Sequence, residues 1–313
     1  MEKLKYAIIG TGGIGGYYGG MLARSGCDVN FLLRSDYEYV RQNGLQIDSV
    51  RGDFHVSGVK AYRSTEDMPV CDVVFVCLKT SDNGILPTIL PPILGRQSRV
   101  VLIQNGIGVE REVQAMLPNV ALAAGVAYVC TSKIGPGHIH HQDLGKLIIA
   151  PFTDGGNIAQ NDPVIEQVVV DLRAAGVEAS TDAYGGLRWK KSVWNVPFNG
   201  LTVVLNTTTD RLVANPETTE LVRDIAIEVV RAANKCGYDL SDTMADSTIE
   251  LTRGIIPYSP SMKLDYDRHH KMEIKYLYLN AIEEAARYGA EMPLTKMLAE
   301  QLEFIEAGYL AGK

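Results

Sequence analysis

KYAIIGTGGIG, residues 5–15, decides the fold of this chain. Residues 5–10 predict a strand, residues 14–25 predict a helix ended by Gly26, and residues 28–33 predict a second strand. A Gly-x-Gly-x-x-Gly turn between strand and helix, in a strand–helix–strand unit of about thirty residues, is typical of a dinucleotide site. The predicted cofactor loop consists of Gly10, Thr11, Gly12, Gly13, Ile14 and Gly15.

Three glycines of this loop have separate expected roles. We expect Gly10 to permit the tight turn, Gly12 to let the backbone approach the pyrophosphate, and Gly15 to let the helix pack against the strand. Backbone N–H groups at the start of the helix would then bind the phosphate charge. The alternative is a glycine-rich turn that only connects strand and helix.

The end of the second predicted strand indicates which nicotinamide cofactor binds. NAD sites usually carry an acidic residue there for the ribose 2′-hydroxyl, whereas this chain has Arg34 followed by Ser35. A guanidinium can bind a 2′-phosphate with two parallel hydrogen bonds. We therefore predict NADPH, although Asp36 lies close by and a solvent-facing Arg34 is the alternative.

The first half of the chain continues with patterns that are typical of a parallel sheet. Near-continuous apolar runs predict central strands, and shorter β-like pieces, a helix and a last strand follow. These predicted strands cover residues 73–78, 99–104, 120–129, 138–141, 146–150 and 177–180, and the helix covers residues 163–175.

After about residue 182 the pattern becomes helical. Helices are predicted at residues 187–206, 216–236, 240–254, 271–288 and 294–307. The predicted fold class is α/β, with an N-terminal Rossmann-type doubly wound parallel sheet over residues 1–182 and an all-α C-terminal domain over residues 183–313.

Composition excludes several functional classes. The 313 residues carry a formal net charge of −7, which gives no general attraction to nucleic acid or anionic membranes. The longest apolar run, residues 120–130, is much shorter than the ~20 residues that cross a bilayer. Five scattered cysteines without a CxxC pair predict neither a disulfide framework nor a zinc site, and a cytoplasmic location fits them. The histidine groups lack a third ligand at suitable spacing, so no metal is predicted.

Two loops follow predicted strands and belong to the expected cofactor crevice. Lys79 follows the strand at residues 73–78, and Asn105-Gly106 follows the strand at residues 99–104. Open α/β sheets bind ligands at the carboxyl ends of their parallel strands. Equivalent positions on successive strands favour a functional role over a surface charge and a plain turn.

The most informative part of the second half is WKKSVWNVPFN, residues 189–199. Lys191, Asn195 and Asn199 are spaced i, i+4, i+8 and so share one stripe of a predicted helix. Polar groups on an otherwise apolar helix are costly unless they face a cleft or find partners. Pro197 predicts a kink or an early end of this helix.

The chain resembles the ketopantoate reductase (2-dehydropantoate 2-reductase) family over essentially its whole length. The resemblance is carried by the Gly10-x-Gly12-x-x-Gly15 turn, Arg34, Lys79-Thr80, Gln104-Asn105-Gly106, the Lys191/Asn195/Asn199 stripe, and Ser261-Met262 followed by Glu273.

The resemblance implies an NADPH-dependent reduction of a 2-oxo acid, and it implies residue roles. Lys191 would be the general acid, and Glu273 would help set its charge and position. Lys79 would stabilise negative charge near the cofactor. Asn105 would link the cofactor and substrate ends of the cleft. The hydroxyl and carboxylate of the substrate would be held by Asn195, Asn199 and Ser261. A structural lysine paired with Glu273 is the alternative for Lys191.

The chain departs from the family pattern at two positions, Thr209 and Tyr258, where the family tends to carry Asn. This leaves the identity of the 2-oxo acid open. Ketopantoate is the first candidate; another 2-oxo acid or an imine is the near alternative, and a non-catalytic NADP(H)-binding regulator is the alternative of another class. The apolar helices of the second domain would support a homodimer.

Overall fold

The structure, a computed structural model, describes residues 3–153 and 161–311. It divides into two compact units, each described by itself below. The first comprises residues 1–104 and 109–184, and the second comprises residues 105–108 and 185–313. The sequence-based boundary after residue 182 did not separate residues 105–108 from the sheet unit.

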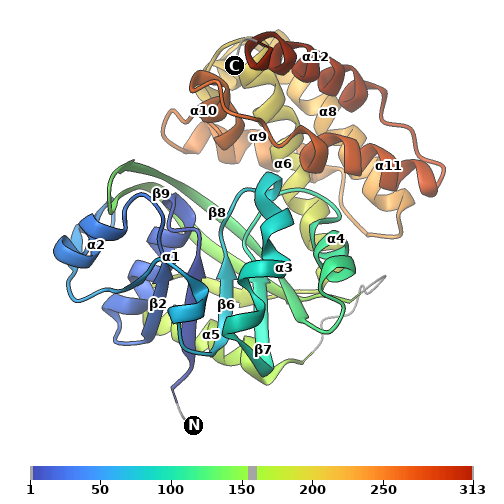
Figure 1. The fold of residues 1–313 in the computed structure, drawn as a ribbon. Helices are drawn as coiled ribbons and strands as arrows, with labels where there is room; N and C mark the ends of the chain where they lie inside the picture. Colours follow the sequence, from blue (N-terminus) through green and yellow to red (C-terminus); the bar gives the residue numbers. More distant parts are fainter. Residues whose placement is uncertain (1–2, 154–160, 312–313) are drawn as a thin grey trace. The chain divides into compact units, whose positions relative to one another are not determined.

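The first unit is built on a ten-stranded sheet whose central part is parallel (Figure 1). The parallel strands lie in the order β5-β2-β1-β6-β7-β8. Their bounds are β1 Lys5–Ile9, β2 Asp28–Leu32, β5 Lys60–Tyr62, β6 Cys71–Val76, β7 Leu94–Leu102 and β8 Ala121–Gly135. The chain runs from β1 outward in both directions, which is the doubly wound Rossmann order. The predicted fold class is confirmed.

Helices cover both faces of this sheet. The crossover from β1 through α1 (Gly13–Arg24) to β2 runs in one direction, and those through α3 (Leu86–Ile89) and α4 (Val109–Met116) run in the other. Because such crossovers are right-handed, α1 lies on the opposite face from α3 and α4. The α1 face is buried against Tyr6 and Ile8 of β1 and against α5 (Pro163–Ala174).

An extension with both antiparallel and parallel pairs completes the sheet. β9 (His138–Pro151) pairs with β8 antiparallel, β3 (Leu45–Ser49) and β10 (Ala179–Thr181) pair with β9, and β4 (Phe54–Val56) pairs with β3. The predicted separate pieces at residues 138–141 and 146–150 are therefore one strand. The apolar pattern breaks between them because the register shifts there, with Leu144 at φ 62°.

The second unit is all helical over its described residues. Its main core is shared by α6, α8 and α12 and by the segment around Tyr278, and Figure 1 shows α8 beside α9 and α12. The helices are α6 Tyr184–Val204, α7 Thr209–Ala214, α8 Pro216–Lys235, α9 Thr243–Gly254, α10 Ser261–Asp267, α11 Asn280–Arg287 and α12 Pro293–Leu310. Within the described ranges, no helix is long and apolar enough to cross a membrane.

One prediction for the helical part was wrong in detail and another was met in part. The helix predicted at residues 187–206 is present as α6, which continues through Pro197 to Val204, so of the two outcomes predicted for the proline the early end does not occur. The single helix predicted at residues 271–288 is a π-helical turn, Lys275–Leu279, that continues as α11. Both differences concern the same place in the unit, because the π-helical turn packs against α6 near Pro197.

Candidate functional site

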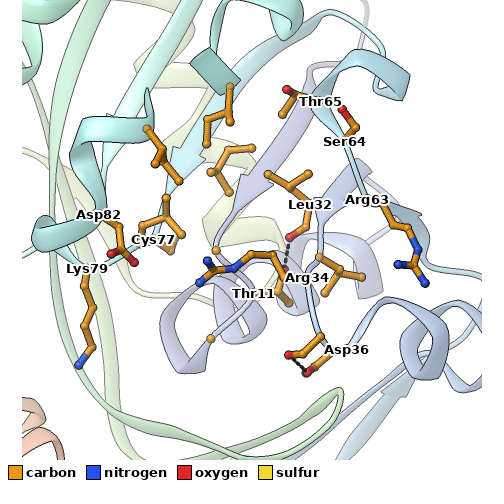
Figure 2. A pocket seen from close by; sticks show the side chains of 18 of the residues that line it. Thr11, Leu32, Arg34, Asp36, Arg63, Ser64, Thr65, Cys77, Lys79 and Asp82 are labelled. Atoms are coloured by element: carbon orange, nitrogen blue, oxygen red, sulfur yellow. Dashed lines mark hydrogen bonds between the residues drawn. The ribbon is translucent and has the colours of Figure 1, made fainter. Parts of the chain in front are cut away.

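A cavity of about 530 Å³ lies at the carboxyl ends of the parallel strands in the first unit. Its walls come from the loops after β1, β2, β5 and β6 (Figure 2). Lys133 of β8 also lines it. The sheet order reverses between β1 and β6, and ligands of open α/β sheets bind at such switch points. The cavity is therefore placed where a dinucleotide would bind.

The glycine turn forms one wall of this cavity. Gly10 has φ 96°, and a Cβ there would lie 2.9 Å from the backbone of Cys77. A Cβ on Gly15 would lie only 2.2 Å from the Gly10 carbonyl oxygen, so α1 packs directly on the turn. A Cβ on Gly12 would meet nothing within 4 Å. No side chain caps the start of α1 at Gly12, and this open, backbone-lined surface fits a pyrophosphate.

Arg34 extends its guanidinium across the cavity close to Thr11 (Figure 2). It is exposed and directly follows the buried Leu33, and the Thr11 hydroxyl donates to the Leu32 carbonyl at 3.3 Å. A cation at this position fits a 2′-phosphate, as the sequence predicts.

Asp36, which left the cofactor prediction open, has its carboxylate occupied by the protein. It forms an ion pair with Lys133 at 2.6 Å and accepts hydrogen bonds from the Gly137 N–H at 3.0 Å and the Ser35 hydroxyl at 2.9 Å. Burial opposes its charge, but these three donors hold the pKa of Asp36 below its usual value. A carboxylate tied in this way is poorly placed to receive a ribose 2′-hydroxyl.

The sequence did not identify two further cations of this cavity, Lys133 and Arg63. Arg63 directly follows β5, and β5 pairs in parallel with β2, so Arg63 and Arg34 leave the sheet at neighbouring positions. Arg63 lies 4.5 Å over the Tyr37 ring and pairs with Glu38 at 2.6 Å. The three-residue strand β5 was too short to be predicted. A prediction of that strand would have placed Arg63 at the carboxyl edge of the sheet.

The loops after β6 and β7 differ in what they contribute. Lys79 lines the cavity, and Figure 2 shows its side chain extending away from the Asp82 carboxylate. Gln104 is buried and joins the two strand ends, donating to the Leu78 carbonyl at 2.8 Å and to Asn83 at 2.7 Å. Asn105, which follows immediately, belongs to the second unit.

In the second unit, Asn105 contacts the predicted polar stripe of α6. The Asn195 amide donates to the Asn105 side-chain oxygen at 3.4 Å. Asn199 donates to the Asn195 carbonyl at 3.0 Å and accepts from the Met262 N–H at 3.2 Å. Asn199 thereby ties α6 to the first turn of α10, which begins at Ser261.

Lys191 and Glu273 lie on separate elements of this unit. Lys191 is half-buried on α6, with its ammonium 5.2 Å from the Trp194 ring centroid. Glu273 is buried, with 9% of its surface exposed, and its carbonyl accepts from the Leu277 N–H at 3.1 Å at the start of the π-helical turn. Among the described residues, no group of three or more His, Cys, Asp or Glu side chains could hold a metal ion.

The two positions that depart from the family pattern are in direct contact. Both the N–H and the hydroxyl of Thr209 donate to the Tyr258 carbonyl, at 3.2 and 3.0 Å. Thr209 is fully buried. It therefore anchors the segment that leads into Ser261.

Comparison with known proteins identifies the family. The model for "Ketopantoate reductase PanE/ApbA" matches residues 6–154, and the model for its C-terminal part matches residues 184–306. The chain belongs to the ketopantoate reductase family. This confirms the resemblance and makes the protein an oxidoreductase of the kind that uses a nicotinamide cofactor.

Individual proteins resemble the chain over at least 96% of its length. A 2-dehydropantoate 2-reductase of Nostoc is 41% identical and covers 100% of this chain and 98% of its own. The crystal structure of a 2-dehydropantoate 2-reductase from Geobacter metallireducens is 36% identical, with a TM-score of 0.90 over 96% of this chain and 99% of its own. A D-mandelate dehydrogenase solved with NADH and anilino(oxo)acetate shares the fold at 20% identity, with a TM-score of 0.85 over 98% of this chain and 99% of its own.

Proposed function

We propose that this protein reduces ketopantoate to pantoate with NADPH, a step of pantothenate and coenzyme A biosynthesis. The observation that carries the proposal is 41% identity to a 2-dehydropantoate 2-reductase across the whole chain. The dinucleotide cavity in one unit and the Lys191, Asn195 and Glu273 positions in the other agree with it.

The cofactor assignment to NADPH rests on the charges around the second strand. Arg34 and Arg63 line the cavity, whereas Asp36 is bound to Lys133, Gly137 and Ser35. Cations favour a 2′-phosphate, and an occupied carboxylate removes the usual partner of a 2′-hydroxyl. Gly10, Thr11, Gly12, Gly13, Ile14 and Gly15 would hold the pyrophosphate, with Lys79 near the cofactor. NADPH bound in this way supplies the hydride.

The chemistry of the reaction requires one proton at the carbonyl oxygen. Addition of hydride to the ketone carbon moves the carbonyl electron pair onto oxygen, and a proton completes the alcohol. We assign that proton to the Nζ of Lys191, which becomes a neutral amine and is reprotonated from solvent. A cation beside the developing alkoxide also lowers the barrier before the proton moves. Glu273 would set the charge and position of Lys191.

The substrate contacts are divided between direct and supporting residues. We assign Asn105, Asn195 and Ser261 to the hydroxyl and carboxylate of the substrate. The contacts of Asn199 favour a supporting role, because its oxygen accepts from Met262 and its amide donates to the Asn195 carbonyl. In this assignment Asn199 contributes to substrate binding by holding Met262, and with it the adjacent Ser261, in position.

A panel of carbonyl substrates tests the proposed function. NADPH oxidation followed at 340 nm should be fastest with ketopantoate and slower with unbranched 2-oxo acids or imines. Preference for another 2-oxo acid or an imine would transfer the assignment to that substrate, and the contact between Thr209 and Tyr258 marks where the pocket would differ. Tight NADPH binding without turnover of any member would favour a non-catalytic regulator.

We also propose a cytoplasmic homodimer. All five cysteines are free, which suits a reducing compartment. Exposed apolar side chains on α12, Met297 and Phe304, provide a surface for association of two helical units. One family member, from Staphylococcus aureus, is described as dimeric. Sedimentation at micromolar concentration distinguishes a dimer from a monomer.

A further inference from the structure

The hydroxyl of Tyr278 contacts α6 inside its hydrogen-bond ladder. It donates to the Val196 carbonyl oxygen at 2.9 Å, and the Gly200 N–H lies against the same phenol oxygen. In a regular α-helix these two groups bond to each other, since residue 200 is four positions after residue 196. Tyr278 is fully buried, and burial raises the pKa of its phenol, so the hydroxyl remains a neutral donor.

Gly200 makes this contact possible. A Cβ at residue 200 would lie 2.8 Å from the Tyr278 oxygen and 2.4 Å from Leu298 of α12. The absence of a side chain therefore lets both the phenol and α12 approach the α6 backbone. A side chain that inserts into the backbone hydrogen bonds of a helix is one of the recognised causes of local helix bending.

The contact lies one residue from Pro197 of the same helix. Pro197 lacks the N–H that would bond the Val193 carbonyl, and its ring crowds the preceding turn. A helix weakened at this point needs an external partner to hold one geometry. Tyr278 provides that partner at Val196, between Asn195 and Asn199 of the polar stripe.

The π-helical turn that carries Tyr278 also holds two other parts of the proposed site. The Ile107 N–H donates to the Tyr276 carbonyl at 2.9 Å, which fixes the segment that follows Asn105. Glu273 precedes the turn, and its carbonyl bonds the Leu277 N–H. π-Helical turns are rare and occur frequently at functional sites.

We propose that Tyr278 is a positioning residue for the substrate site. Its hydroxyl fixes the turn of α6 that carries Asn195 and Asn199. Since the Asn199 side chain accepts a hydrogen bond from the Met262 N–H, this turn also fixes the start of α10 at Ser261. This inference rests on the proposed function for its kinetic consequence. Its structural consequence, an α6 turn held by one hydroxyl, is independent of the substrate.

Tyr278→Phe tests the proposal because it keeps the ring and removes only the hydroxyl. We expect the KM for ketopantoate to rise about tenfold, since small displacements of positioning groups cost one to two orders of magnitude. The NADPH dissociation constant should stay within about twofold, because the glycine turn and Arg34, which line the dinucleotide cavity, lie in the other unit. Amide hydrogen exchange of residues 198–204 should accelerate in the free protein.

Two control variants separate positioning from general destabilisation. Tyr18→Phe removes a comparable buried hydroxyl, which donates to the Lys146 carbonyl at 3.1 Å in the sheet unit. Val229→Ala weakens the same helical core from α8 without touching α6 hydrogen bonds. Both should lower stability and leave the KM for ketopantoate unchanged.

A double-mutant cycle with Pro197→Ala adds a readout that loss of stability alone would not produce. Alanine restores the N–H that bonds Val193, so the hydroxyl should matter less, and Tyr278→Phe should raise KM less in that background. Unchanged KM and unchanged exchange in Tyr278→Phe would overturn the proposal. If the wild type reduces no 2-oxo acid, the proposed function fails, and the exchange rate at residues 198–204 in Tyr278→Phe still decides whether the hydroxyl holds this turn of α6.

Discussion

Arg34→Ala should weaken NADPH binding strongly and NADH binding little. Arg34 is exposed and reaches into the cavity at the end of β2, where only the 2′-phosphate distinguishes the two cofactors. A hydrogen bond to a charged group contributes about 1.5–3 kcal/mol. Since about 1.4 kcal/mol corresponds to tenfold in affinity, the NADPH dissociation constant should rise roughly 10- to 100-fold. Arg63, which remains at the cavity wall, keeps the loss from being larger.

Isothermal titration with each cofactor measures this effect, and ionic strength provides a second check. An exposed cation is screened over about 8 Å at physiological salt, so the difference between wild type and Arg34→Ala should shrink as salt is added. Arg96→Ala, which removes an exposed arginine near the beginning of β7, is the matched control and should change neither dissociation constant. Equal losses for NADPH and NADH would refute the 2′-phosphate assignment.

Two further predictions concern the same unit. Gly12→Ala should abolish tight cofactor binding and leave thermal stability nearly unchanged, because the new Cβ would meet no protein atom. Gly15→Ala should also lower the free energy of unfolding by about 1–3 kcal/mol, because its Cβ would clash with the Gly10 carbonyl. Equal melting temperatures for the two variants would contradict this difference. Asp36→Asn should lower stability by about 1–2 kcal/mol at pH 7. The pKa of Asp36 is lower in the folded state than its unfolded value of about 3.9. Its stabilising contribution is therefore present above that value and is lost as the pH falls through the folded pKa. The free energies of unfolding of the wild type and Asp36→Asn should converge below about pH 4. A constant difference down to pH 2 would exclude the ion pair with Lys133 as the cause.

The predictable features of the molecule are those encoded by neighbouring residues. The glycine turn directly follows the apolar run of β1, and Arg34 lies just after β2 at the usual distance from the turn, so the cofactor end could be predicted directly from the sequence. The Lys191, Asn195 and Asn199 stripe was predictable for the same reason, since one helix spacing places all three on one face.

Features that depend on distant residues were not predictable. Asp36 and Lys133 are far apart in the sequence, and they meet only because the β8–β9 hairpin is placed beside β3 in the sheet. No local sequence pattern links the two residues. Short strands such as β5 have too few residues for an alternating pattern, which concealed Arg63. Tyr278 could not be recognised from the sequence, because a π-helical turn has no sequence signature of its own and the contact of its hydroxyl depends on Val196 of another element.

The most direct test of the proposed reaction is the steady-state rate of ketopantoate reduction by Lys191→Met with saturating NADPH. The account predicts that kcat falls about 10²- to 10⁴-fold, the usual contribution of a positioned general acid. The NADPH dissociation constant should be unchanged, and Lys190→Met, which alters the adjacent lysine of α6, should retain the wild-type rate. A Lys191→Met enzyme that reduces ketopantoate at the wild-type kcat would contradict the assignment of Lys191 as the proton donor.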